Sequence, residues 1–265
     1  MEKPFYMNNN ILKGIKYEDV IIQIYEFINK VNIFEYGCIS HPTINYFGAS
    51  PDGIVDSNSI NKNYIGRMLE IKCPSTRDIT GFIPDYYHAQ VQGQLEVCNL
   101  DYCDFVECKI EEYNDINEYF NDYININNYY LNNNNLYKGV IIEAYNNSKG
   151  KNTFYYCNLG YNRKQIEKWE TEIIDLIFNN ENLDYIKTTF WKSIEYNELL
   201  IKRDKNYFNN ICLPKINSFW NDVLLYRKNT NLLDKSKTNS KTKTKTYYKK
   251  KNIINYTNEF LSDSD

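Results

Sequence analysis

The sequence lacks several features that would have placed it in another class of protein. No apolar run approaches the roughly 20 residues that a membrane-spanning helix needs. The N-terminal stretch MEKPFYMNNN has no hydrophobic segment of the kind found in secretory signals. We therefore expect an intracellular protein that is neither secreted nor inserted in a membrane.

Cysteine pairs of the C-x-x-C type are also absent. The chain has 7 cysteines, an odd number, which argues against a disulfide framework and fits a reducing compartment. Cys98, Cys103 and Cys108 form the one group that could hold an iron–sulfur cluster. In a strand, however, Cys103 and Cys108 would face opposite sides. We expect buried or free thiols and no iron–sulfur cluster.

Glycine and histidine are scarce, with 10 and 2 residues, whereas tyrosine reaches 26. Because Asn, Ile and Lys are abundant as well, the bias is typical of an AT-rich genome, and a single exposed Tyr or Asn carries little functional information. A chain of 265 residues with 42% hydrophobic residues is long enough to bury a sizeable core. One large domain, or a domain with an appendage, is expected.

The most informative chemistry lies in residues 48–94. Asp52 occupies a Ser-Pro-Asp-Gly turn, and eighteen residues later Glu70 and Lys72 flank Ile71 in an apolar run. Alternate side chains of a strand share a face, so Glu70 and Lys72 would project together while Ile71 enters the core. A carboxylate and an ammonium group would then share one wall of a site.

These residues suit metal-assisted cleavage of a phosphodiester bond. Asp52 and Glu70 would offer hard oxygen ligands to Mg²⁺, and Lys72 would position the attacking water or offset charge that develops at the phosphate. On these residues alone, a turn followed by a strand with an exposed Glu–Lys pair is the commoner structure.

Three stretches in this order resemble the lambda-exonuclease-type, YqaJ-like viral recombinase nucleases of the PD-(D/E)xK, RecB-like superfamily. They are GASPDG at 48–53, LEIKCP at 69–74 and YHAQVQ at 87–92. The resemblance covers about residues 11–110. It implies an α/β (α+β) fold with a PD-(D/E)xK restriction-endonuclease-like core, in which a mixed central sheet is flanked by helices, with helical additions toward the C-terminus.

The resemblance also implies a domain organisation and a set of metal ligands. Residues 1–230 would form a lambda-exonuclease-like nuclease domain, and residues 231–265 a Lys/Thr-rich disordered tail. Within the helix predicted at 15–28, Glu18 matches the further active-site glutamate, and Glu26 is the reserve choice. The implied metal ligands are Glu18, Asp52, Glu70 and the backbone carbonyl of Ile71.

A helix is predicted at residues 85–98, and the resemblance places the active-site glutamine there at Gln90, where it could hold Lys72 or a phosphate oxygen. Tyr87 would line the site and contact DNA. His88 could serve as a base, but a local hydrogen bond is the commoner role of such an imidazole. The implied catalytic set is therefore Glu18, Asp52, Glu70, Lys72 and Gln90.

The stretch 235–251 differs in kind, because it contains eight lysines and no acidic residue. Without these eight, 23 of the 31 basic residues remain against 34 acidic ones. Two interpretations stay open. The stretch is a solvated, disordered tail, or it tethers DNA by counterion release. In the second case Lys243, Lys245, Lys249 and Lys250 are the candidate contacts.

For the other elements, periodicity predicts a strand beside the catalytic strand, a helix or loop rich in Asn, a strand pair, and two further helices. Their expected ranges are 102–109, 114–135, 139–145 with 153–157, 163–178 and 211–226. These segments are expected to be structural and to take no part in the chemistry.

The resemblance implies a Mg²⁺-dependent deoxyribonuclease, with Mn²⁺ able to substitute. Such an enzyme would digest duplex DNA ends in the 5′-to-3′ direction and expose single strands for an annealing protein, in recombination or repair. A homo-trimer and a viral setting in the host cytoplasm or nucleus are also implied. A structure-specific endonuclease is one alternative. A DNA-binding recombination factor with impaired cleavage is another, since only seventeen residues precede Glu18 and the family's DNA-gripping segment is not visible there.

Overall fold

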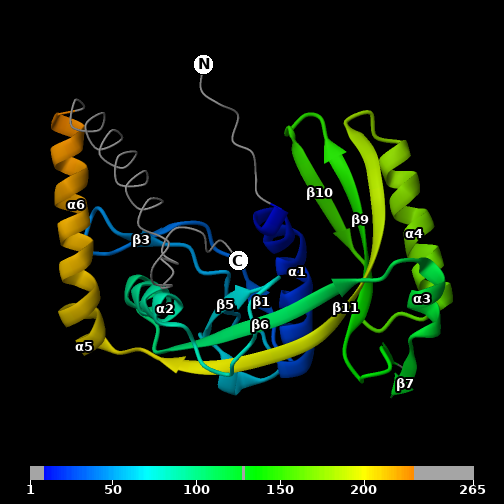
Figure 1. Cartoon of the computed structure of the whole chain (residues 1–265), viewed down its shortest axis with the longest axis horizontal. Helices are drawn as coiled ribbons and strands as arrows, with labels where there is room; N and C mark the ends of the chain where they lie inside the picture. The colour runs from blue at the N-terminus through cyan, green and yellow to red at the C-terminus, as the bar shows by residue number, and fades with distance from the viewer. Residues whose placement is uncertain (1–8, 127–128, 230–265) are drawn as a thin grey trace, which may run out of the picture.

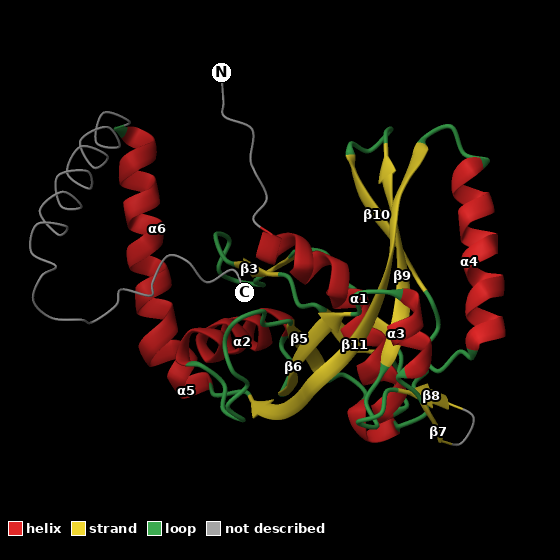
Figure 2. Ribbon diagram, turned by 45° about the vertical axis from the view of Figure 1, so that its right-hand side comes forward, coloured by secondary structure: helices red, strands yellow, loops and turns green. Residues whose placement is uncertain are grey.

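The computed structural model describes residues 9–126 and 129–229. A long, curled sheet crosses the molecule with helices on both of its faces (Figures 1 and 2). Across this seven-stranded sheet the order is β1 (Ile33–Phe34), β4 (Gly53–Val55), β5 (Met68–Lys72), β6 (Tyr102–Glu112), β11 (Leu183–Lys202), β9 (Lys138–Asn146) and β10 (Lys151–Tyr156). Strands β5 and β6 are parallel and the other neighbours antiparallel. The predicted mixed sheet flanked by helices is confirmed.

The helices are α1 (Asn9–Asn29), α2 (Asp85–Cys98), α3 (Ile116–Asn121), α4 (Arg163–Phe178), α5 (Lys205–Tyr207) and α6 (Leu213–Lys228). A 3-10 turn, η1 (Lys62–Tyr64), and a π-helical turn, η2 (Phe208–Cys212), complete them. The bounds predicted for α2 and α4 are confirmed, and α1 begins earlier than expected. The helices after β10 are the expected C-terminal additions.

Helices α1 and α2 cover opposite faces of strands β5 and β6. On one face, Ile21 of α1 packs in the same buried cluster as Leu69 and Ile71. On the other face, Leu95 of α2 packs with Met68 of β5. Strand β5 is thus buried on both sides, which is typical of parallel pairing between helices. Because Leu69 and Ile71 face α1, the alternate side chains of Glu70 and Lys72 point toward α2.

Strand β11 joins the two halves of the sheet. Its first part pairs with β9, from Leu183 opposite Asn146, and its last part pairs with β6, ending at Lys202 opposite Tyr102. Register shifts at 185/187 and 193/195 interrupt the alternation. Helix α4 packs on the β9–β11 half, where Ile177 lies in one buried cluster with Ile142. The sequence did not indicate this strand.

Two small hairpins accompany the sheet. Strands β2 (Ile39–Ser40) and β3 (Gly48–Ala49) form one, and β7 (Ile124–Ile126) and β8 (Tyr129–Leu131) form the other. The segment 114–135, expected to be helix or loop, therefore contains the short α3 and a hairpin. The predicted strand pair at 139–145 and 153–157 is confirmed as β9 and β10.

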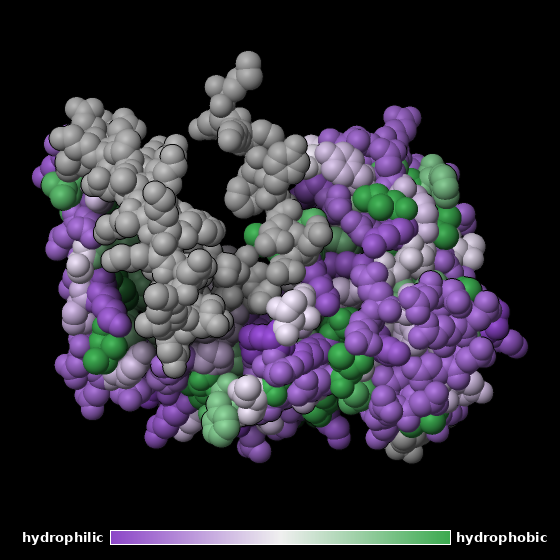
Figure 3. Space-filling model, in the orientation of Figure 1, coloured by the Kyte–Doolittle hydropathy of each residue, from purple (hydrophilic) through white to green (hydrophobic). Residues whose placement is uncertain are grey.

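Helix α6 lies at the end of the molecule away from α4 (Figure 1). The loop between β2 and β3 holds it there, because Tyr46 stacks on Trp220 with ring centroids 5.1 Å apart and its hydroxyl donates to Asn217 Oδ1 at 2.6 Å. The surface over α3 and α4 is mainly hydrophilic (Figure 3). Among the described residues, no helix combines the length and apolarity that crossing a membrane requires.

Candidate active site

Glu70 is the centre of a hydrogen-bonded group on the α2 face of β5. Its side chain is 1% exposed. Oε1 accepts from Lys72 Nζ at 2.6 Å and from Gln90 Nε2 at 2.7 Å. Oε2 accepts from Gln94 Nε2 at 2.7 Å. A buried carboxylate with a charged partner and two amide donors is fixed in one orientation.

Asp52 reaches the same site from the turn that precedes β4. Its Oδ2 accepts a hydrogen bond from the backbone N–H of Ile71 at 2.6 Å, which joins the turn to β5. Burial and the nearby charge of Glu70 raise the pKa of Asp52 to about 8. The two carboxylates thus repel each other when both are ionised. A divalent cation between them would relieve that repulsion.

Gly53, the residue after Asp52, has no room for a side chain. A Cβ on Gly53 would come within 2.2 Å of Ile33 Cγ2 on the neighbouring β1, a distance that no side chain tolerates. Gly53 in turn lies opposite Leu69 in the β4–β5 ladder. Because this position has no side chain, β1, β4 and β5 can pack closely. This packing places Asp52 near Glu70.

Helix α1 brings Glu18 to the site. Burial, and then the charges of acidic neighbours including Glu70, raise the pKa of the Glu18 carboxyl, whereas Lys72 opposes this shift. Glu18 thus lies within the electrostatic reach of both residues of β5. The reserve choice, Glu26, is a structural residue, since its Oε1 accepts from the backbone N–H of Ile33 at 2.7 Å.

Contact of Tyr87 with DNA remains a prediction, although this tyrosine is largely buried. Its ring is only 5% exposed and packs against Phe105 with centroids 5.7 Å apart. Lys72 Nζ lies 4.7 Å from the Tyr87 ring centroid, a cation–π contact. The buried Tyr87 ring therefore packs against Lys72 and helps to position its ammonium group.

Gln90 and Gln94, two of the three glutamines of α2, both donate to Glu70, and Gln90 is exposed to solvent. Gln94 was missed as a site residue. The signal was its position one turn after Gln90 on the same helix face. Its Nε2 also lies 3.3 Å from the carbonyl oxygen of Ser50. His88 packs edge-on against Tyr207 with centroids 4.8 Å apart, and nothing in its surroundings gives it a catalytic role.

A second ion pair adjoins Lys72 and was also missed. Glu107 of β6 lies opposite Lys72 in the parallel ladder and is 0% exposed. Its Oε1 accepts from Arg77 Nη2, and the Arg77 guanidinium lies 5.5 Å from the Tyr87 ring centroid. The same aromatic ring thus contacts two cations. The Arg77–Glu107 ion pair therefore fixes the loop that follows β5 beside the site.

The donor set fits a hard divalent cation. Within residues 9–126 and 129–229, no group of three or more His, Cys, Asp or Glu side chains could hold a metal on its own. Mg²⁺ does not need such a group, because it usually binds one or two carboxylates and completes its shell with water and substrate phosphate. Asp52 and Glu70 are two such carboxylates, close enough for the charge of Glu70 to raise the pKa of Asp52.

Other predicted residues lie elsewhere. Cys103 and Cys108 are buried in different clusters on the two faces of the sheet, as the alternation of a strand requires. The tail at 231–265, with Lys243, Lys245, Lys249 and Lys250, lies outside the described residues.

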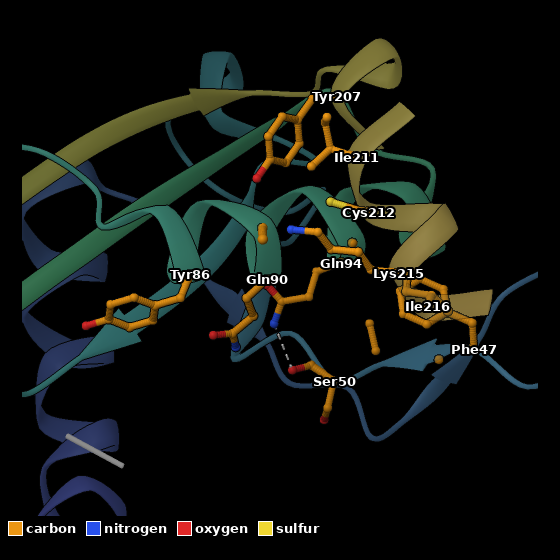
Figure 4. A pocket seen from close by; sticks show the side chains of 14 residues that line it. Phe47, Ser50, Tyr86, Gln90, Gln94, Tyr207, Ile211, Cys212, Lys215 and Ile216 are labelled. Atoms are coloured by element: carbon orange, nitrogen blue, oxygen red, sulfur yellow. Dashed lines mark hydrogen bonds between the residues drawn. The ribbon is translucent and has the colours of Figure 1, made fainter. Parts of the chain in front are cut away.

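A cavity of about 510 Å³ adjoins the site between α2, β3 and the α5–α6 region. Gln90 and Gln94 form part of its lining (Figure 4). The same two amides that orient Glu70 are therefore reached from this cavity.

The turn before β4, strand β5 and helix α2 bring together Asp52, Glu70, Lys72 and Gln90. Residues 1–101 are similar to the family model of the YqaJ-like viral recombinase domain. This match supports the family resemblance found in the sequence.

The uncharacterized protein R354 of Acanthamoeba polyphaga mimivirus is 33% identical over 257 residues, covering 88% of this chain and 46% of the relative. The chain thus spans about half the length of that relative. An alkaline exonuclease from Laribacter hongkongensis, solved alone and in complex with dAMP, is 22% identical over 66% of this chain. The match covers 70% and 69% of those two chains, with a TM-score of 0.34 for each.

Proposed function

We propose that this protein is a metal-dependent deoxyribonuclease that hydrolyses DNA phosphodiester bonds at duplex ends. The observation that carries the proposal is the buried Glu70 carboxylate, held by Lys72, Gln90 and Gln94 next to the buried Asp52. Two carboxylates and a lysine at one point are the side chains that phosphodiester hydrolysis needs. The match of residues 1–101 to the YqaJ-like family model supports the assignment.

Each side chain then has a distinct task. Asp52 and Glu70 hold Mg²⁺, with the Ile71 carbonyl and Glu18 as further candidate ligands, and Mn²⁺ is expected to substitute. When bound, the cation supplies Lewis acidity and lowers the pKa of a coordinated water. Lys72 orients the attacking water or stabilises negative charge on the phosphate. No iron–sulfur cluster is part of the proposal.

The two glutamines act on Glu70 and not on the phosphate. Each donates to a different carboxylate oxygen, so the plane of the carboxylate is fixed before substrate binds. Residues that orient a metal ligand in this way typically affect metal affinity or activity about 10–100-fold when they are replaced.

Digestion in the 5′-to-3′ direction, hand-over of the exposed single strand to an annealing protein, and a homo-trimer around DNA are parts of the same proposal. They rest on the family alone. The mimivirus relative is in keeping with a virus that recombines or repairs its DNA in the host cytoplasm or nucleus.

The test compares a linear duplex, 5′-labelled and 5′-phosphorylated, with a closed circle, in Mg²⁺ and in EDTA. We expect the wild-type protein to release label from the linear duplex and to leave the circle intact. This release should occur in Mg²⁺, not in EDTA, and should be absent with the Lys72→Ala variant. Nicking of the circle would instead indicate an endonuclease. Binding of both substrates without cleavage would indicate a recombination factor and would refute the proposal.

A further inference from the structure

A second cavity lies at the α3–α4 end of the molecule, whereas α2 and α6 lie toward the other end (Figure 1). It is formed by α3, the start of β9 and the first turn of α4, and its volume is about 470 Å³. Cavities of about 300–1,000 Å³ typically hold one small molecule. None of the described residues that line it belongs to the proposed catalytic group. The cavity therefore has a use that the proposed cleavage does not explain.

The inner wall of this cavity contains a buried lysine. Lys138, the first residue of β9, lines the cavity and is only 4% exposed. Its ammonium donates to the backbone carbonyl oxygens of Tyr119 and Asp122 and lies 4.0 Å from the Tyr119 ring centroid. These partners are neutral, and no carboxylate within residues 9–126 and 129–229 forms an ion pair with it. Because lysine is almost never buried to this extent without a paired charge, an anion in the cavity would supply what the fold does not.

Burial lowers the pKa of Lys138 to about 8, although the charge of Asp122 opposes this shift. The Asp122 carboxylate is itself held by other donors, since it accepts from the Tyr113 hydroxyl at 2.7 Å and from the Asn133 backbone N–H at 2.6 Å. It is therefore fixed away from an ion pair with the lysine. A bound anion would favour the protonated form of Lys138.

Two more cations line the cavity at the start of α4. Arg163 and Lys164 are its first two residues, and its first turn has no acidic residue. Cations are unfavourable here, because this end of the helix dipole is positive. Arg163 pairs with Glu167 at 2.7 Å, but both side chains are more than half exposed, so the pair contributes little. Lys164 forms no ion pair with any residue that the structure describes. Positive charge thus remains at the cavity without a counter-charge from the fold.

The rest of the wall is largely aromatic. Tyr119, Phe120 and Tyr161 line the cavity. The ring centroids of Tyr119 and Phe120 lie 5.2 Å apart in an edge-on contact, and the Arg163 guanidinium lies 4.6 Å from the Phe120 centroid. Asn158 donates to the Tyr161 hydroxyl at 2.8 Å, which fixes the third ring. Aromatic side chains of this kind stack on nucleobases with little regard to which base is present.

We propose that this cavity binds a nucleoside monophosphate, with the phosphate between Lys138 and the cations at the start of α4 and the base against the aromatic wall. Inorganic phosphate would use only the cations, and an uncharged nucleoside only the rings. A molecule that carries both groups uses the whole lining. The inference goes beyond the proposed nuclease and does not depend on it.

The experiment is calorimetric titration of the full chain in EDTA at low salt, with dAMP and dCMP as probes. EDTA removes the divalent cation that the candidate active site is proposed to need. We expect both nucleotides to bind, one molecule per chain. Inorganic phosphate and deoxyadenosine should each bind about tenfold more weakly, because each lacks one of the two contacts.

A pair of lysine variants on α4 separates the cavity from general surface charge. Lys164→Gln is expected to weaken dAMP binding about fivefold. Lys168→Gln is the matched control, because this exposed lysine lies one turn further along α4, where it pairs with Glu172 at 3.7 Å and does not line the cavity. It removes the same charge and should leave dAMP affinity unchanged.

Two further variants test the inner contacts. Lys138→Met is expected to weaken dAMP binding about tenfold or more, and circular dichroism shows whether this variant is folded. Tyr161→Leu is expected to weaken dAMP binding about tenfold and to leave the affinity for inorganic phosphate unchanged. The exposed Lys164 keeps the inference testable if the buried lysine proves essential for folding.

Several outcomes would overturn the inference. They are the absence of nucleotide binding in EDTA, equal weakening by Lys164→Gln and Lys168→Gln, and equal affinity for dAMP and inorganic phosphate. A single-stranded oligonucleotide that binds where dAMP does not would assign the cavity to DNA instead. Loss of dAMP binding in Lys72→Ala would place the nucleotide at the candidate active site.

Failure of this inference is distinguishable from failure of the proposed function. Cleavage of linear DNA in Mg²⁺ is measured separately. A chain that binds dAMP in EDTA but cuts no DNA would refute the nuclease and leave the nucleotide site intact, and the reverse result would refute the site alone.

Discussion

The side-chain amide of Gln94 donates to Glu70 Oε2 across 2.7 Å and so ties the third turn of α2 to the central strand of the site. Gln90, one turn earlier, donates to the other oxygen. Helix α2 thus fixes both oxygens of one carboxylate. The orientation of Glu70 depends on the helix as much as on the strand that bears it.

Gln94→Leu is expected to reduce DNA cleavage about 10–100-fold, because Glu70 Oε2 loses the donor that holds it and the carboxylate can rotate. The change should appear as a higher Mg²⁺ concentration at half-maximal rate. Gln92→Leu is the matched control, since Gln92 on the same helix bonds Lys202 O and the Asp204 amide instead. The control should lower the melting temperature while activity per folded molecule is kept. Equal metal dependence in both variants would contradict the role of Gln94.

Lys72→Ala is expected to lower the maximal rate on linear duplex DNA about 100–1,000-fold, with little change in DNA affinity, because its ammonium acts at the reacting phosphate. Lys62→Ala is the control, since this exposed lysine of η1 donates to the carbonyl oxygen of Ser57. Single-turnover kinetics separates the two parameters. A loss confined to affinity would assign Lys72 to DNA binding.

The stability of the metal-free protein is expected to fall as the pH rises from about 5 to about 8. The folded-state pKa of Asp52 is raised from 3.8 to about 8 by burial and by Glu70. Between these values the folded protein holds a proton that the unfolded chain has released, so rising pH favours unfolding. Thermal denaturation in EDTA should show this fall.

Asp52→Asn should flatten that pH profile, because the amide does not titrate. Mg²⁺ should raise the melting temperature more at pH 8 than at pH 5, since it binds ionised carboxylates. A profile that is unchanged in Asp52→Asn would place the pH dependence on other groups.

Arg77→Met is expected to destabilise the protein by about 3–5 kcal/mol, because it leaves the fully buried Glu107 without its charged partner. The double variant Arg77→Met/Glu107→Leu should recover most of this loss, since no buried charge then remains. Urea denaturation of wild type, both single variants and the double variant measures the coupling. If the losses of stability in the two single variants simply add in the double variant, Arg77 and Glu107 are not energetically coupled.

Much of the site was accessible from the sequence, because motif residues lie on regular elements. The alternation in β5 placed Glu70 and Lys72 on one face, and the structure joins them at 2.6 Å. Helix α4 was predicted with correct bounds, since its apolar spacing is regular and Asn162 and Gln165 form a capping box at its start. Local signals suffice for such elements.

Contacts between distant segments were not accessible. Pairing of Arg77 with Glu107 depends on the parallel register of β5 and β6, which no local pattern encodes. Strand β11 was missed because its two register shifts interrupt the alternation of apolar and polar side chains. In addition, one half of β11 pairs with β9 and the other half with β6. Burial of Tyr87 was not foreseen either, because it depends on the sheet that covers this face of α2.

Strand β11 also has a consequence for how the chain folds during its synthesis. Every motif that matches the family lies in residues 1–101, yet β6, which flanks the catalytic strand, completes its ladder only with residues up to Lys202. Until those residues leave the ribosome, one edge of β6 has no partner and is open to wrong pairing. Sequence-distant pairing of this kind slows folding. The nascent protein therefore contains every proposed catalytic residue long before it can assemble the site.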